Sequence, residues 1–196
     1  RQGLQRAGTF ILLIAAINLT GVLVGSVMVH SGNNLALSYR DGLVARAHAS
    51  DPASLALREG DPWRAALIDF GRNLFLGAIP ETIGGMTIVI PVFLSAYRSW
   101  VGGIVTVNGD HVSRFANPFQ GAYVISVLVL QLIPYSLAAG VGVNLGWSIV
   151  RPRQEYQGAR WYGVPIEALR DAARVYILIV PMFFMASLWE FLSPWN

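Results

Sequence analysis

The sequence predicts an all-α, polytopic membrane protein with about five membrane segments, and three observations support this fold class. Residues Thr9–His30 form a run of 22 without a charged side chain, which in a helix extends about 33 Å, enough to cross the hydrocarbon core of a bilayer. Further apolar blocks follow at Ala65–Tyr97, Phe119–Val150 and Val175–Trp189. Hydrophobic residues make up 54% of the chain and charged residues only 13%, against about 25% charged in soluble domains. We therefore expect residues 1–196 to form a single membrane domain.

The composition argues against several functional classes. All 14 basic residues are arginine, they oppose 11 acidic residues, and a net charge of +3 is too small to indicate nucleic-acid binding. The absence of cysteine excludes disulfides, thiolate metal sites and cysteine nucleophiles. Glycine-rich nucleotide-binding motifs, HExxH and GxSxG are absent, and His30, His48 and His111 lack a metal-ligand spacing. We therefore expect a protein that is not an enzyme and holds no cofactor or metal.

The first span, Thr9–His30, follows Arg1 and Arg6, and arginine beside a span favours the cytoplasmic side. A cleaved signal peptide is the alternative, but the apolar run exceeds the usual length of about 7 to 15 residues. We expect a retained helix and a cytoplasmic N-terminus. Because the first residue is not methionine, we also expect residues to precede Arg1.

Charge also predicts the sidedness of two polar segments. Residues 31–63 carry three arginines against four acids and are expected to be extracytoplasmic. Residues 151–174 carry five arginines against three acids and are expected to form a cytoplasmic connector before the last span, residues 175–192. The C-terminus is then extracytoplasmic, which requires an odd number of crossings of a bacterial inner membrane.

Two short helices near the membrane surface are expected in the outer polar segment. Asp51 precedes Pro52 and Asp61 precedes Pro62, and each pair is typical of an N-cap followed by proline at the first helical position. The first of these helices should run to Leu57, and the second should open the next apolar block.

Prolines interrupt the two long apolar regions. Residues 65–107 exceed a span of about 20 residues and contain Pro80, so we expect an amphipathic beginning and then one kinked crossing. Residues 119–150, with Pro134, fit either one long tilted helix or a re-entrant hairpin of two half-helices. The hairpin would keep residues 114 and 151, both arginine, on the same side of the membrane.

Small residues predict where helices approach closely. Gly84 and Gly85 should allow a neighbouring helix to come near, and Gly140, Gly142 and Gly146 give the penultimate span a small-residue face with a GxxxG match. We favour packing within the chain over dimerisation through this face.

Polar side chains within the apolar blocks are the strongest functional candidates, since a charge at the bilayer centre costs about 2.5 to 3.5 kcal/mol on insertion scales. Arg72 is expected to pair with Asp69 at i and i+3. Glu81, with Asn73 nearby, should line a polar cavity or an ion path, and Glu190 should lie near water. A structural charge and hydrogen bonds between helices are the alternatives. The candidate polar site comprises Arg72, Asn73, Glu81, Gln131 and Glu190.

The C-terminal part has a distinctive order of motifs: LGWSIVRP, an arginine-rich connector, and EALRDAARVYILIVPMFFMASLWEFLSPW. This order resembles the stage II sporulation protein M family of bacterial integral membrane proteins, with a similar pattern from residue 65 to 194. In that family a small-residue helix ends in a Leu-Gly-Trp-like step and a nearby proline, and the last helix ends in Glu, an aromatic and Ser/Thr-Pro. The corresponding residues here are Leu145, Gly146, Trp147, Pro152, Glu190, Phe191, Ser193 and Pro194.

The chain departs from the family pattern at its polar positions. Where the family shows His-Gly and then Glu on the penultimate helix, this chain has Val127, Leu128 and Gln131. The Asn-Asn pair before the second span is reduced to Arg72 and Asn73, and the ending is one residue shorter. A polar site built on the family's Glu is therefore expected to be lost or altered.

The resemblance implies a non-enzymatic scaffold or assembly subunit that works with other membrane or envelope proteins, in a homo- or hetero-oligomer. The family's founding member looks like a scaffold for peptidoglycan-degrading partners, although sporulation itself does not follow. Proline-broken helices and a buried carboxylate favour an alternative, a transporter or permease component. A third alternative is an accessory subunit of an energy-converting or pigment-containing complex, with His30 as its candidate ligand. The lipid bilayer is the expected partner in every case, and nucleic acid is not.

Overall fold

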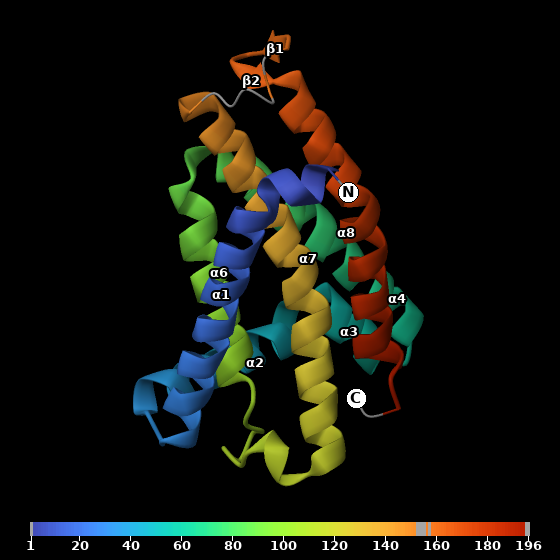
Figure 1. The fold of residues 1–196 in the computed structure, drawn as a ribbon. Coiled ribbons are helices and arrows are strands. Elements are labelled where there is room, and N and C mark those ends of the chain that lie inside the picture. Colours follow the sequence, from blue (N-terminus) through green and yellow to red (C-terminus); the bar gives the residue numbers. More distant parts are fainter. Residues whose placement is uncertain (1, 152–155, 157, 195–196) are drawn as a thin grey trace.

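The computed structural model describes residues 2–151, 156 and 158–194, and most of them are helical (Figure 1). This confirms the all-α class. The long helices are α1 (Gln2–His30), α7 (Pro118–Val150) and α8 (Ile166–Leu192). The shorter elements are α2 (Asn34–Ser50), α3 (Pro52–Arg58), α4 (Pro62–Gly71), the π-helix η1 (Arg72–Ala78), α5 (Ile79–Gly84), α6 (Val89–Ile104), and the 3₁₀ turns η2 (Gly85–Thr87) and η3 (Arg114–Ala116).

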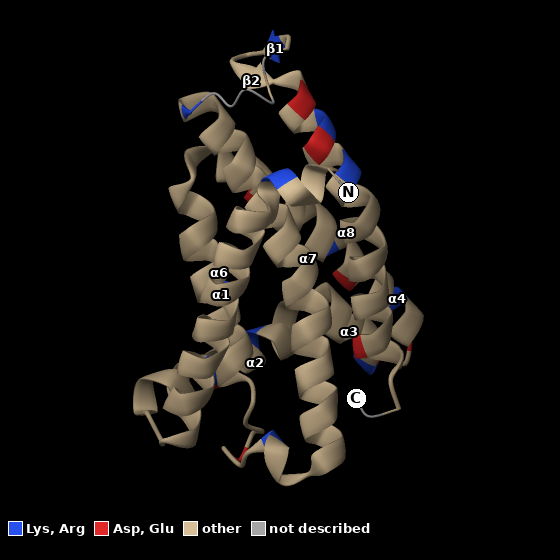
Figure 2. Ribbon diagram, in the orientation of Figure 1, with Lys and Arg blue, Asp and Glu red and all other residues tan. Residues whose placement is uncertain are grey.

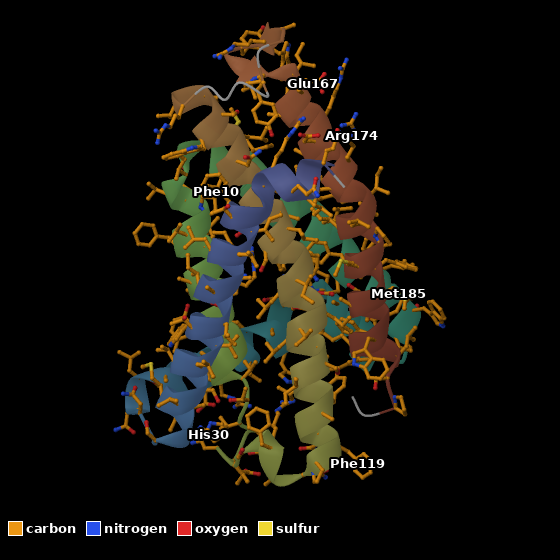
Figure 3. All side chains as sticks on the ribbon, viewed as in Figure 1. Phe10, His30, Phe119, Glu167, Arg174 and Met185 are labelled. Carbon is orange, nitrogen blue, oxygen red and sulfur yellow. The ribbon has the colours of Figure 1, made fainter. Side chains whose placement is uncertain are left out.

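Within the described residues, α1, α7 and α8 are long and apolar enough to cross a membrane. In Figure 1, α1 and α8 descend while α7 rises between them. Figure 3 places His30 and Phe119 together at one end of the bundle and Glu167 at the opposite end. We call these the His30 end and the Glu167 end. The charged positions gather mostly toward the ends of the bundle and the first turns of α8, as Figure 2 shows.

The segment 119–150 is one continuous helix, so the re-entrant hairpin is wrong and the long helix is confirmed. Pro134 removes one backbone hydrogen bond, but the helix is buried at Pro134 and along the turns that follow, where neighbouring helices hold it in place. Because the helix does not turn back, Arg114 and Arg151 lie beyond its opposite ends rather than on the same side.

Residues 65–107 form two arms rather than one kinked crossing. The first arm passes through α4, η1 and α5, and the second is α6. Glu81 contacts Ser95 and Arg98, whereas residues 14 positions apart in a straight helix would be about 21 Å apart. The chain reverses at Ile88, whose φ of 67° is rare for a β-branched residue. Pro80 lies in the first turn of α5, directly after the wider turns of η1.

Both predicted N-caps are confirmed. The Asp51 side chain accepts a hydrogen bond from the Ser54 amide at the start of α3. The Asp61 side chain accepts one from the Arg64 amide at the start of α4. A longer helix, α2, precedes them and begins after Asn33, which caps it in the same way. These local signals succeed because capping depends on residues only three positions apart.

The described part of the connector 151–174 contains secondary structure that the sequence did not predict. Strands β1 (Arg160–Trp161) and β2 (Val164–Pro165) form a small antiparallel hairpin, and α8 then begins at Ile166, nine residues before the predicted last span. Pro152, one of the residues that carry the family resemblance, lies outside the described residues. The first helix is also longer than its apolar core and begins at Gln2.

The predicted glycine contacts lie mostly inside the chain. A Cβ on Gly85 would lie 2.3 Å from the Gly142 carbonyl carbon, and one on Gly142 would lie 2.5 Å from the Thr82 carbonyl oxygen. The turn after α5 and the middle of α7 are therefore in backbone contact. Gly84 does not take part, since a Cβ there would meet only the Ile90 side chain, at 3.2 Å.

The remaining small-residue contacts join α7 and α6 to their neighbours. A Cβ on Gly140 would lie 2.6 Å from the Ile11 Cα on α1, and one on Gly146 would lie 2.6 Å from the carbonyl oxygen of residue 86. A similar contact that was not predicted joins α6 to α1, since a Cβ on Gly103 would lie 2.3 Å from the Val22 carbonyl oxygen. Packing within the chain thus uses the small-residue faces that a partner helix would need.

Candidate functional site: carboxyl groups inside the bundle

A buried ion pair joins α5 to α6. Glu81 has no exposed surface, and its carboxylate accepts hydrogen bonds from Arg98 Nη1 at 2.5 Å and from Ser95 Oγ at 3.0 Å. The Arg98 guanidinium carbon lies 3.5 Å from the centroid of the Tyr135 ring on α7, a cation–π contact. The charge of Glu81 is thus fully paired.

The Tyr135 hydroxyl links this ion pair to a second carboxyl group. It donates to Asn73 Oδ1 at 2.7 Å, and Asn73 Nδ2 donates to Asp69 Oδ2 at 2.8 Å. Ser187 Oγ of α8 donates to the same Asp69 oxygen at 2.7 Å. Asp69 therefore lies where α4 and α8 meet, held by neutral donors.

A third carboxyl group lies one turn further along α8. Glu190 follows Ser187 by three residues and so lies on the same face of the helix. Its side chain accepts a hydrogen bond from Gln131 Nε2 of α7, and it lies within electrostatic range of Asp69. We call Asp69 and Glu190 the carboxyl pair.

The carboxyl pair differs from Glu81 in having no cation. Among the described residues no arginine forms an ion pair with Asp69 or Glu190, and their side-chain partners are the hydroxyl and amide groups of Ser187, Asn73 and Gln131. Two carboxyl groups within electrostatic range of each other each disfavour ionisation of the other, and an apolar environment adds to that cost. The arrangement is suited to holding a proton or sharing a cation.

A cavity of about 410 Å³ reaches Glu190 from outside the bundle. Its walls come from α2 and α3, from Val105 just after α6, from Arg114 of η3, and from α7 and α8. Glu190 is the acidic side chain in this lining, so the cavity leads to the Glu190 member of the carboxyl pair.

A separate polar cluster near the Glu167 end is structural in character. Asp171 of α8 is 2% exposed and forms ion pairs with Arg6 at 2.8 Å and Arg174 at 3.1 Å. The Tyr156 hydroxyl donates to it at 3.4 Å. Two arginines compensate the charge of Asp171, and its ion pair with Arg6 ties α1 to α8.

The structure separates the predicted polar residues into three groups. Gln131 is hydrogen-bonded to Glu190, Asn73 is linked to Glu81 only through Tyr135 and Arg98, and Arg72 lies apart from both. Asn73 is therefore linked to Glu81 only indirectly. Glu190 is half-buried and hydrogen-bonded rather than simply hydrated.

The predicted pairing of Arg72 with Asp69 is wrong. Arg72 forms its ion pair with Asp51, the N-cap of α3, and its side chain is 47% exposed. The backbone changes from α to π geometry at Arg72, which rotates this side chain away from the direction that an i, i+3 pair needs. Arg72 thus belongs to the outer helices and not to the internal site.

The sequence analysis did not identify Arg98 and Tyr135, two residues that link Glu81 to Asn73 and Asp69 inside the bundle. Arg98 is the one charged residue in the apolar stretch Val89–Ile104, and the rule that drew attention to Glu81 could have identified it. Tyr135 carried no comparable signal, because a tyrosine in an apolar helix is common in helix packing.

Both ring nitrogens of His30, the candidate pigment ligand, have hydrogen-bond partners. His30 has its Nδ1 2.7 Å from the Ser26 carbonyl oxygen, which makes Nδ1 the donor, so Nε2 accepts from Ser113 Oγ at 2.8 Å. Both ring nitrogens are therefore engaged. Groups of three or more potential metal ligands are absent from the part of the chain that the structure describes.

No protein-family model, curated protein or solved structure matches this chain. Its function is therefore inferred from the residues and their geometry.

Proposed function

We propose that the chain is a non-enzymatic component of a transport system in a bacterial inner membrane, and that the carboxyl pair binds the coupling proton or cation. The observation that carries this proposal is the contact set of Asp69 and Glu190, which contains neutral donors and no arginine among the described residues. A transport step requires a site that can gain and lose positive charge, and these two groups provide one.

The energetics favour reversible charge at this site. An ionised carboxylate within a membrane span is costly unless it is paired, with the largest cost, about 2.5 to 3.5 kcal/mol on insertion scales, at the bilayer centre. Glu81 avoids this cost through Arg98, whereas Asp69 and Glu190 avoid it by holding a proton or a cation. Access through the cavity beside Glu190 makes exchange with the solvent feasible.

The helix geometry is consistent with this role. Transporters commonly place ion sites where membrane helices are broken, because the irregular backbone then faces protein or a cavity rather than lipid. Here the arm that carries Asp69 changes from α to π geometry at Arg72 and is followed by Pro80. Asp69 lies directly before that change.

We further propose five membrane segments: α1, the arm from α4 to α5, α6, α7 and α8. The N-terminus is then cytoplasmic and the C-terminus extracytoplasmic, as the arginine distribution favours. In this orientation the cavity beside Glu190 opens toward the extracytoplasmic side.

The experiment is proton or cation flux in liposomes containing the purified protein and a pH-sensitive dye. Glu190→Gln and Asp69→Asn each keep shape and hydrogen bonding but remove the charge, and we expect each to lower flux at least tenfold. Glu167→Gln is the matched control, because Glu167 lies at the opposite end of the bundle (Figure 3) in an exposed pair with Arg170. Equal flux in all variants would overturn the proposal.

These variants are more informative than Glu81→Gln. Neutralising Glu81 leaves Arg98 without its carboxylate partner and threatens folding, so loss of flux would be ambiguous. Asp69 and Glu190 lack such a partner, and their neutral analogues leave no buried charge uncompensated.

Assembly with partner proteins, implied by the C-terminal resemblance, is a second proposal. Its specific support is the outward face of α1, where large apolar side chains such as Leu12, Leu19 and Val27 are 72%, 62% and 66% exposed. The small-residue faces of α7 are already used within the chain, so a partner would contact α1 instead. Co-purification in mild detergent tests this, and repeated isolation as a lone monomer would count against it.

A further inference from the structure

The cavity beside Glu190 has a basic edge that the transport proposal does not use. Arg58 of α3, His48 of α2 and Arg114 of η3 line it. No described residue forms an ion pair with Arg58 or Arg114. Two unpaired arginines face one cavity in which Glu190 is the single acidic residue of the lining, and its carboxylate is bonded to Gln131.

Arg114 is also short of hydrogen-bond partners. Its Nε atom is buried and has no partner among the described residues. Burial, and then the nearby positive charge of Arg40, lower the pKa of Arg114 below its usual value. A buried donor without an acceptor is destabilising, and more so when it is charged.

Arg40, which lies within electrostatic range of Arg114, also has a buried Nε without a hydrogen-bond partner in the described part of the chain. The residue is only 5% exposed, and one terminal nitrogen donates to Asp41 at 2.7 Å. Two arginines therefore lie within electrostatic range of each other with an unsatisfied donor on each. An anion beside the exposed part of the Arg114 guanidinium would offset the repulsion between the two arginines.

The rest of the cavity is apolar. Eight of the fourteen lining residues are aliphatic or phenylalanine, including Val124, Leu128 and Phe191. An inorganic anion would gain nothing from these walls, whereas a hydrocarbon chain would bury its surface there. The volume of about 410 Å³ falls within the range of about 300 to 1,000 Å³ that is usual for small-molecule sites.

We propose that this cavity binds an anionic amphiphile, with its phosphate group held by Arg114 and Arg58 and its hydrocarbon chain against the apolar wall. The position supports a membrane-derived ligand, because the cavity lies between the outer helices α2 and α3 and the spanning helices. Arginine is the preferred partner for such a group, since its planar guanidinium donates two parallel hydrogen bonds to phosphate oxygens. Binding here requires no transport.

The test is binding to the full chain in a neutral detergent, followed by native mass spectrometry and calorimetry. The probes are a short-chain phosphatidic acid, a phosphatidylcholine with the same chains, and inorganic phosphate. We expect phosphatidic acid to bind at least tenfold more tightly than either other probe. Arg114→Gln should weaken this binding at least tenfold, while Arg170→Gln, which removes an exposed arginine at the opposite end, should not.

Three results would overturn the inference: equal binding of the two lipids, equal binding of inorganic phosphate, or unchanged affinity in Arg114→Gln. If Arg114→Gln does not fold, Arg58→Gln provides the same comparison from an exposed side chain of α3. Because the readout is affinity, failure here leaves the flux of the carboxyl-pair variants as an independent result.

Discussion

Glu81 and Arg98 form an ion pair inside the bundle, with 2.5 Å between Oε2 and Nη1 and no exposed surface on Glu81. Arg98→Gln should therefore lower the free energy of unfolding by about 3 to 5 kcal/mol, because it leaves a buried carboxylate without its cation. Denaturant unfolding in detergent micelles measures this change. Arg170→Gln is the control, and its exposed pair with Glu167 should contribute at most about 1 kcal/mol.

The double variant Glu81→Met with Arg98→Met separates pairing from packing. A buried ion pair replaced by apolar residues of similar volume is often neutral, so the double variant should be more stable than Arg98→Gln alone. If both variants lose the same stability, the pair does not act through charge compensation.

Gly142 permits the closest approach of α7 to the turn after α5. Gly142→Ala should destabilise the protein by about 1 to 3 kcal/mol, because the new Cβ would lie 2.5 Å from the Thr82 carbonyl oxygen. Gly8→Ala is the matched control, since nothing lies within 4 Å of its added Cβ. In Gly8→Ala the free energy of unfolding should rise by about 0.5 to 1 kcal/mol, because alanine favours the helix more than glycine does. Thermal unfolding in detergent compares the two, and equal effects would contradict the packing.

Asp51 both caps α3 and pairs with Arg72. Asp51→Asn retains an N-cap but loses the charge, whereas Asp51→Ala loses both. We expect the alanine variant to cost about 1 kcal/mol more than the asparagine variant. Hydrogen exchange of the Ser54 amide measures the cap directly, and similar exchange in both variants would mean that the ion pair dominates.

Asp41 links α2 to the loop before η3 and should respond to acid. Hydrogen bonds from Arg40 and then His111, at 2.7 and 2.8 Å, hold the pKa of Asp41 below its usual value of 3.8. A lowered folded pKa adds stability that is present above about pH 3.8 and is lost as the pH falls through the folded value. Deuterium uptake of residues 108–113, corrected for intrinsic rates, should therefore rise between pH 5 and pH 3.

The control for this pH effect is Asp41→Asn, which should show the raised uptake already at pH 5 and little further change. Asp110→Asn, in the same loop, should behave like the unchanged protein. A rise of equal size in Asp41→Asn would assign the pH effect to another group.

Parts of the candidate site were accessible from the sequence and parts were not. Glu81, Gln131 and Glu190 stand out because polar groups are rare in apolar runs, and all three have structural partners there. Their partners were not foreseeable. Glu81 contacts Arg98 only because the chain reverses at Ile88. Hydropathy alone does not distinguish such a reversal from a straight continuation of the helix.

The sequence by itself determined the apolar helices and the capped starts at Asp51 and Asp61, since both depend on hydropathy and hydrogen bonding between near neighbours. Only the tertiary structure decided that Asp69 meets Ser187, 118 positions away, and that Arg72 turns outward to Asp51. The physical reason is that two features decide which side of a helix meets its neighbour. One is where two helix backbones can come into contact, as at Gly85 and Gly142, and the other is local rotation of the helix, such as that caused by the π geometry of η1. These long-range contacts decide which carboxyl groups are paired with arginine and which are held by neutral donors.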